Sequence, residues 1–345
     1  MAKVNEQLSG LLQQHIEAGE FPSAVYLVGK RDEIVYEDAL GHSVVEPYRV
    51  ANKIDTIYDL ASLTKPLVTA LLCARRIELG ELTLDSSVSH YLPEFDRTDK
   101  QMITIRELLT HTSGLPAWRP LYVLTEEQPD RAAGAIASLD LEYKPGTRVV
   151  YSDLGFIALG ILLERMMHQR LADMAKREIF EPLNLQQTFF NPEIALQTGI
   201  AACETGNTYE RDMSKQMGAG EYANSRQRLI WGEVHDGNAY FLGGAAGHAG
   251  LFSTARETFL GPLINAAAVK KYGGAVRLGK RQKNRILNGL VDKKIIHRFF
   301  TGHSQAAGIA GCNCMRTTEP CLHTRNGIGR ESKRVDPLVS FSVPM

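Results

Sequence analysis

The sequence contains no uninterrupted apolar stretch long enough to cross a membrane, although 44% of its 345 residues are hydrophobic. A membrane-spanning helix needs about 20 consecutive apolar residues. The N-terminus also lacks the apolar core of a secretory leader, because Asn5, Glu6 and Gln7 follow Lys3 where that core would begin. We therefore expect a cytoplasmic protein without a membrane span.

Two further absences exclude classes of function. No His-Glu-x-x-His or comparable set of metal ligands appears, which argues against a metallohydrolase, and we expect neither a metal nor a cofactor. The formal net charge is zero and no nucleic-acid-binding motif is present, so we expect no nucleic-acid partner. The composition is that of a globular protein with one large domain or two of medium size.

The zero net charge hides a change of composition near residue 258. Residues 259–345 carry a net charge of +11 and the rest of the chain −11, and three of the five cysteines lie in this tail. The basic run 270–298 could bind nucleic acid or anionic lipid, but it lacks aromatic residues at stacking intervals. Four possible zinc ligands, at a spacing unlike that of the usual zinc knuckles, are Cys312, Cys314, Cys321 and His323. We expect a disordered or poorly packed tail.

A serine and a lysine three residues apart lie at the start of an expected helix. Pro66 is tolerated only where a helix has no backbone hydrogen bond to lose, which places Ser62 in the first turn or its cap. Residues three apart share a helix face, so the Lys65 amine can reach the Ser62 hydroxyl. A lysine that burial makes neutral could take the serine proton and create a nucleophile. The alternative is an N-cap serine with a solvated lysine, since Ser-x-x-Lys is expected about once by chance in a chain of this length.

Periodicity along the rest of the chain predicts a mixed fold. An amphipathic N-terminal helix precedes two strands, at residues 23–30 and 33–37, that form a β-hairpin. From Leu72 to about residue 205 the pattern is mostly helical, and strand-like, glycine-rich sequence returns at 239–253.

These patterns predict an α/β (α+β) protein with an inserted helical domain. Residues 1–66 and about 206–258 are assigned to a sheet domain, and residues 67–205 to an all-helical domain. The site cleft is expected between the two domains.

A second possible site motif precedes an expected helix over residues 156–167. Tyr151 and Asp153 lie where a short apolar run meets that helix. Each residue has an ordinary structural explanation, because Asp153 could cap the helix and Tyr151 could be a half-buried aromatic. Their order and separation from Ser62 and Lys65 favour a shared site.

Four segments together resemble the penicillin-recognising serine hydrolases, which include class C β-lactamases, D-alanyl-D-alanine carboxypeptidases and related esterases. They are Asp59-Leu-Ala-Ser-Leu-Thr-Lys65, Leu108-Leu-Thr-His-Thr-Ser-Gly-Leu-Pro116, Pro145-Gly-Thr-Arg-Val-Val-Tyr-Ser-Asp153 and Gly243-Gly-Ala-Ala-Gly-His-Ala-Gly-Leu-Phe-Ser-Thr254. The resemblance spans about residues 5–258. It implies the β-lactamase/transpeptidase-like fold, an antiparallel sheet flanked by helices with an inserted all-helical domain.

The resemblance also implies roles for the motif residues. Ser62 is the expected acylated nucleophile, Lys65 its base partner, and Tyr151 the carrier of protons to the leaving group or from the deacylating water. Lys65 and Tyr151 would titrate as a coupled pair, so either could be the base. Asp153 stands where many members carry Asn, and a carboxylate cannot donate a hydrogen bond to a substrate as an amide can. Esterase-like and muropeptide-processing members carry this Tyr-Ser-Asp version.

Family members also need a third motif, Lys-Thr-Gly or His-Thr-Gly or a variant, on a strand opposite the serine. His248-Ala-Gly250 lies too early in the chain for that motif; His248 is a candidate substrate-binding residue, with a packed loop histidine as the alternative. His235 and Asp236 could line the cleft or form a turn. No third motif appears after residue 258, and together with the change of composition this predicts a frameshift in the gene, which resequencing would test.

The sequence therefore predicts a serine hydrolase that forms an acyl-enzyme on Ser62. Its expected partner is a small acyl substrate: an ester, a β-lactam or a muropeptide. A cytoplasmic protein would be an esterase or a muropeptide amidase rather than an enzyme that trims wall cross-links. The alternative is a catalytically inactive relative, or a truncated product, that lacks the third motif. The oligomeric state is not predicted.

Overall fold

The computed structural model describes residues 2–30, 33–97, 99–218, 226–259 and 339–342. The α-helices are α1 (Glu6–Glu17), α2 (Ala70–Glu78), α3 (Ile105–Leu109), α4 (Leu121–Leu124), α5 (Ala132–Ser138), α6 (Asp153–Met167), α7 (Leu171–Ala175), α8 (Thr208–Gln216) and α9 (Gly237–Phe241). The strands are β1 (Ser23–Lys30), β2 (Glu33–Val44), β3 (Val50–Ala51), β4 (Ile57–Asp59), β5 (Phe189–Phe190), β6 (Leu251–Thr254) and β7 (Val339–Ser342). Short 3-10 or π turns are η1 (Ala61–Leu63), η2 (Lys65–Thr69), η3 (Val88–His90), η4 (Pro93–Phe95), η5 (Pro129–Arg131), η6 (Lys176–Phe180) and η7 (Ile194–Gly199). The possible zinc ligands, the basic run 270–298 and most of the region expected to hold the third motif lie outside the described residues.

Contacts divide the chain into two compact units, Met1–Thr56 with Ile309–Met345, and Ile57–Gly308. In the first unit the expected hairpin is confirmed, because β1 and β2 pair antiparallel, although β2 runs seven residues beyond the predicted end to Val44. The strand order of this sheet is β3-β2-β1-β7. Helix α1 is anchored to the sheet through Tyr26, whose hydroxyl accepts a hydrogen bond from the Asn5 backbone N–H at 3.0 Å.

The second unit contains a small antiparallel sheet that leads directly into the serine turn. Its strand order is β4-β6-β5, and β4 ends at Asp59, three residues before Ser62. Buried residues under this sheet form an apolar cluster that includes Ile57, Ile200 and Phe252. The sheet therefore fixes the chain that leads into η1.

The prediction of strand-like sequence at 239–253 is only partly confirmed. Strand β6 is present, but residues 237–241 form helix α9, whose N-cap is Asp236. The Asp236 side chain accepts a hydrogen bond from the Ala239 N–H at 2.7 Å. This side-chain cap satisfies a backbone donor that a strand would have used for pairing, so a helical turn forms instead.

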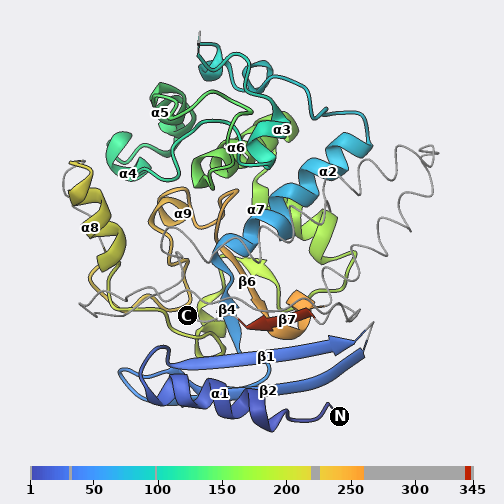
Figure 1. The fold of residues 1–345 in the computed structure, drawn as a ribbon, viewed down its shortest axis with the longest axis vertical. Helices are drawn as coiled ribbons and strands as arrows, with labels where there is room; N and C mark the ends of the chain where they lie inside the picture. The colour runs from blue at the N-terminus through green and yellow to red at the C-terminus, as the bar shows by residue number, and fades with distance from the viewer. Residues whose placement is uncertain (1, 31–32, 98, 219–225, 260–338, 343–345) are drawn as a thin grey trace, which may run out of the picture. The chain divides into compact units, whose positions relative to one another are not determined.

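Helix α6 lies at the centre of the helical part of the second unit, beside α3 in Figure 1. It is apolar on most of its surface and nine of its fifteen residues are buried. The sequence Thr104-Ile-Arg-Glu107 predicts a capping box at the start of α3, and the structure confirms it. Among the described helices, none is both long and apolar enough to cross a membrane.

Candidate active site

Ser62 lies in the first helical turn after β4, where the sequence predicted it. Pro66 stands at the start of η2, where its missing N–H costs no hydrogen bond. Ala61, immediately before Ser62, has φ = 44°, a left-handed conformation that is uncommon for a residue other than glycine. Neighbouring side chains hold it there: the Asp59 carboxylate accepts from the Ala61 N–H at 2.8 Å, and the Thr64 hydroxyl donates to the Ala61 carbonyl at 2.7 Å.

The ammonium of Lys65 is surrounded by the other candidate site residues. Lys65 is fully buried, and its Nζ donates to Ser62 Oγ at 2.9 Å. Nζ also lies 2.6 Å from Asp153 Oδ1, and it donates to the His248 carbonyl at 3.2 Å. The Tyr151 ring completes the surroundings, with its centroid 4.7 Å from Nζ. The tertiary structure thus brings residues of two distant segments, 151–153 and 248, to the amine of Lys65.

The expectation of a neutral Lys65 is not supported. Burial lowers the pKa of Lys65, but the Asp153 carboxylate and then Tyr151 more than offset this effect, so the pKa is raised above its ordinary value. An opposite charge at 2.6 Å stabilises the ammonium where burial alone would have neutralised it. Lys65 at rest is therefore a cation.

Asp153 is not the cap of α6. The cap is Ser152, whose hydroxyl accepts from the Gly155 N–H at 3.3 Å. The Asp153 side chain, 14% exposed, is directed to Lys65 instead. The structure thus places the carboxylate against Lys65, and a carboxylate has no hydrogen to donate to a substrate carbonyl.

Tyr151 is the most accessible of the site residues, with 38% of its surface exposed. Loss of hydration raises the pKa of Tyr151; the Lys65 cation opposes this rise and the Asp153 carboxylate adds to it, with a net upward shift. At neutral pH Tyr151 is therefore a protonated phenol that can donate as well as accept a hydrogen bond.

His111 is a site residue that sequence reasoning did not select, although its motif was recognised. Its Nδ1 accepts from the Ser152 N–H at 3.1 Å, and its carbonyl accepts from the Val150 N–H at 2.9 Å. The His111 ring lies 4.6 Å, centroid to centroid, from that of Tyr151. Burial, followed by the Lys65 charge, lowers the pKa of His111 to about 3, so the ring is neutral. His111 thus holds both neighbours of Tyr151 in place.

His248 reaches the site through its carbonyl and not through its ring. The imidazole is buried, and its Nε2 lies 2.8 Å from Asp236 Oδ1. Burial raises the pKa of Asp236, but His248 and the Ala239 N–H outweigh this effect and lower the pKa overall. The buried ring therefore anchors the loop around His248 to Asp236, as the packed-histidine alternative describes. His235 similarly contacts Glu204, its Nε2 at 2.7 Å from the carboxylate.

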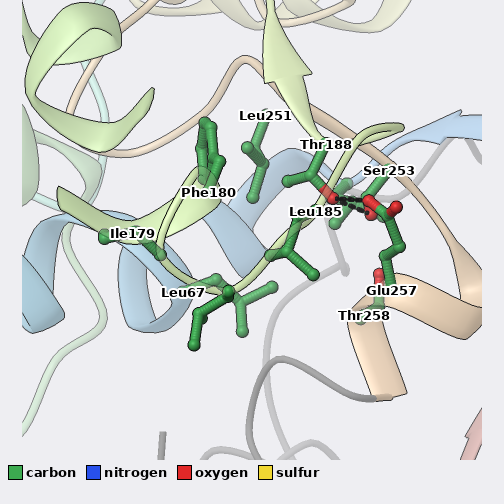
Figure 2. Close-up of a pocket in the computed structure, with 11 residues that line it drawn as sticks. Leu67, Ile179, Phe180, Leu185, Thr188, Leu251, Ser253, Glu257 and Thr258 are labelled. Carbon is green, nitrogen blue, oxygen red and sulfur yellow. Dashed lines mark hydrogen bonds between the residues drawn. The ribbon is translucent and has the colours of Figure 1, made fainter. Parts of the chain in front are cut away.

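A shallow hollow opens on the second unit (Figure 2). Its lining is mainly apolar and includes Leu67, Phe180 and Leu251. At one side, Figure 2 shows Thr188 hydrogen-bonded to Ser253, at 2.7 Å, and to Glu257, at 2.5 Å. None of Ser62, Lys65 and Tyr151 lines this hollow.

The donor atoms of the described residues do not form a metal centre. In this part of the chain no three His, Cys, Asp or Glu side chains gather so that they could hold an ion.

Comparison with known proteins shows the family of this chain. The sequence profile of the family described as Beta-lactamase matches residues 8–267. An N-acetylmuramyl-L-alanine amidase of Bacillus subtilis (strain 168) is 33% identical over 270 residues, covering 72% of this chain and 59% of the relative. The chain spans about three fifths of the length of the curated relatives it matches.

Solved structures confirm the fold. EstCE1, a hydrolase with promiscuous acyltransferase activity, superposes with a TM-score of 0.56 at 24% identity, over 74% of this chain and 70% of its own. A Beta-Lactamase/D-Alanine Carboxypeptidase from Pseudomonas syringae gives 0.57 at 18% identity, over 84% and 70%. The β-lactamase/transpeptidase-like fold that the sequence predicted is thus present. The chain belongs to the Beta-lactamase family.

Proposed function

We propose that this protein is a serine hydrolase that forms an acyl-enzyme on Ser62 and releases the acyl group to water. The observation that carries the proposal is the 2.9 Å hydrogen bond from Lys65 Nζ to Ser62 Oγ, made by a fully buried lysine. A buried amine that contacts a serine hydroxyl can exchange a proton with it, which is what an activated nucleophile requires.

The charge on Lys65 determines how the proton can move. Because the resting Lys65 is a cation, it must release one proton before or while it takes that of Ser62. The Tyr151 ring lies beside Nζ, with its centroid at 4.7 Å, and its protonated phenol can pass the released proton to the leaving group. In this step the bond between Ser62 Oγ and the acyl carbon forms, the bond from that carbon to the leaving oxygen or nitrogen breaks, and the leaving group departs protonated. Water then reverses the sequence and releases the acid.

The substrate class follows from the same residues. The Asp153 carboxylate is engaged with Lys65 and has no proton to donate, so the site offers no amide donor at this position for a β-lactam side chain. We propose an ester or amide of a small or muropeptide-derived acyl group, with β-lactams as weak substrates at most. The similarity to a protein named N-acetylmuramyl-L-alanine amidase supports the muropeptide amide.

The proposal is tested with p-nitrophenyl butyrate and with muropeptides, by following hydrolysis and the mass of the intact protein. The wild type should show a burst and gain the mass of one acyl group on Ser62. Ser62→Ala should show neither, whereas the control Ser138→Ala, at an exposed serine of α5, should behave as the wild type. Equal rates in the wild type and Ser62→Ala would reject the hydrolase and leave the alternative of an inactive, ligand-binding relative.

A further inference from the structure

Asp59 connects two segments of backbone through its two carboxylate oxygens. It is the last residue of β4 and is only 8% exposed. Its Oδ1 accepts from the Ala61 N–H at 2.8 Å, and its Oδ2 accepts from the His235 N–H, also at 2.8 Å. The side chain lies three residues before Ser62 and contacts main-chain donors.

The first of these hydrogen bonds fixes the peptide that precedes the nucleophile. Ala61 has φ = 44°, and such a conformation in a residue with a side chain persists only where the surroundings impose it. Its N–H is held by Asp59 and its carbonyl by the Thr64 hydroxyl. The preceding N–H, that of Leu60, donates to the Leu251 carbonyl at 2.8 Å. The orientation of the backbone at Ser62 therefore depends on these three hydrogen bonds.

The second hydrogen bond joins this turn to the segment that supports Lys65. His235 is followed by Asp236, whose carboxylate lies 2.8 Å from the His248 ring. The His248 carbonyl in turn accepts from Lys65 Nζ at 3.2 Å. One carboxylate thus ties the backbone beside the nucleophile to the loop that holds its amine partner through His248.

We propose that Asp59 is a positioning residue of the acyl-transfer site, which sets the direction of the Ser62 hydroxyl and backbone N–H without touching the substrate. This inference rests on the proposed function. A carboxylate suits the place because both of its oxygens only accept, and here two N–H donors need acceptors. An asparagine has one acceptor oxygen, so its NH₂ group would face one of the two donors.

The test compares Asp59→Asn and Asp59→Ala with Asp85→Asn. Asp85 has a side chain that is 80% exposed and paired with Arg106, so its variant makes the same chemical change away from the site. With p-nitrophenyl butyrate, Asp59→Asn should lower kcat roughly 10- to 100-fold while KM stays within about twofold, because a misdirected nucleophile slows chemistry and not binding. Asp59→Ala should lose at least as much, and Asp85→Asn should lose nothing. Circular dichroism must show that each variant is folded.

A wild-type kcat in Asp59→Asn, or a change confined to KM, would overturn the inference. If the variants do not fold, the inference is tested on the wild type by measuring amide hydrogen exchange with NMR. The Ala61 and His235 amides should then exchange roughly 100-fold or more slowly than in an unstructured peptide, and exchange at the unstructured rate would overturn it. Failure of the hydrolase proposal has a different signature, namely equal hydrolysis by the wild type and Ser62→Ala.

Discussion

Lys65 Nζ and Asp153 Oδ1 form an ion pair of 2.6 Å in which the lysine is fully buried. An amide at position 153 could not offset the cost of burying the ammonium in this way. A buried charge persists only where it is paired and hydrogen-bonded. The pair therefore explains why Lys65 stays protonated beside Ser62.

Replacing that carboxylate should move the pH dependence of the reaction. In Asp153→Asn the main effect left on Lys65 is burial, which lowers its pKa. The reaction needs the amine free to take a proton, so the ascending limb of the kcat/KM profile should move to lower pH by about one unit or more. An ascending limb at the wild-type pH would contradict this prediction. The control is Asp173→Asn, at an exposed aspartate of α7, whose profile should match that of the wild type.

The same change should weaken the fold at neutral pH. A folded-state pKa above the unfolded value means that Lys65 contributes stability below about pH 10.4 and loses it as the pH rises through the folded pKa. Removal of Asp153 takes away this contribution and leaves a buried amine without its partner, so we expect the free energy of unfolding to fall by about 3 kcal/mol. Urea unfolding at pH 7 and at pH 11 measures the difference, which should be smaller at pH 11.

His111 should tolerate asparagine better than leucine. Asparagine can accept from the Ser152 N–H and adopts the left-handed backbone of position 111, φ = 56°, more readily than most residues. Leucine offers no acceptor, so a buried N–H next to Tyr151 would lose its partner, at a cost of about 1–3 kcal/mol. We expect His111→Leu to lose more kcat and more stability than His111→Asn, as measured by ester hydrolysis and urea unfolding. Equal losses in the two variants would show that Ser152 does not depend on this bond.

Gly247 should be irreplaceable by alanine. A Cβ at this position would overlap the Phe156 carbonyl and lie 2.9 Å from the Gly160 nitrogen, both in the backbone of α6. The Gly247 carbonyl also accepts from the Thr69 hydroxyl at 2.7 Å, so the loop cannot shift freely. Gly247→Ala should lower the free energy of unfolding by about 2 kcal/mol or more.

The matched control for this prediction is Gly10→Ala. Gly10 lies inside α1 with nothing within 4 Å of an added Cβ, so alanine should stabilise by about 0.5–1 kcal/mol. Thermal unfolding of both variants gives the comparison. Unchanged stability of Gly247→Ala would mean that the loop can move away from α6.

Local features of the fold could be predicted because they depend on neighbours in the sequence. The hairpin of β1 and β2, the capping box of α3 and the position of Ser62 in a first turn all follow from spacings of a few residues. The prediction of strand-like sequence at 239–253 was wrong over residues 239–241, because the Asp236 cap, and not the apolar content, decides that segment. His111 was missed because its role is to accept a bond from Ser152, a residue that only the fold brings near.

The sequence by itself determined that a hydroxyl and an amine share one helix face, since three residues of helix bring them together wherever that helix lies. Only the tertiary structure decided the charge of the amine. That charge depends on the carboxylate of Asp153, 88 positions away along the chain, because an ion pair at 2.6 Å outweighs the burial that would otherwise neutralise Lys65.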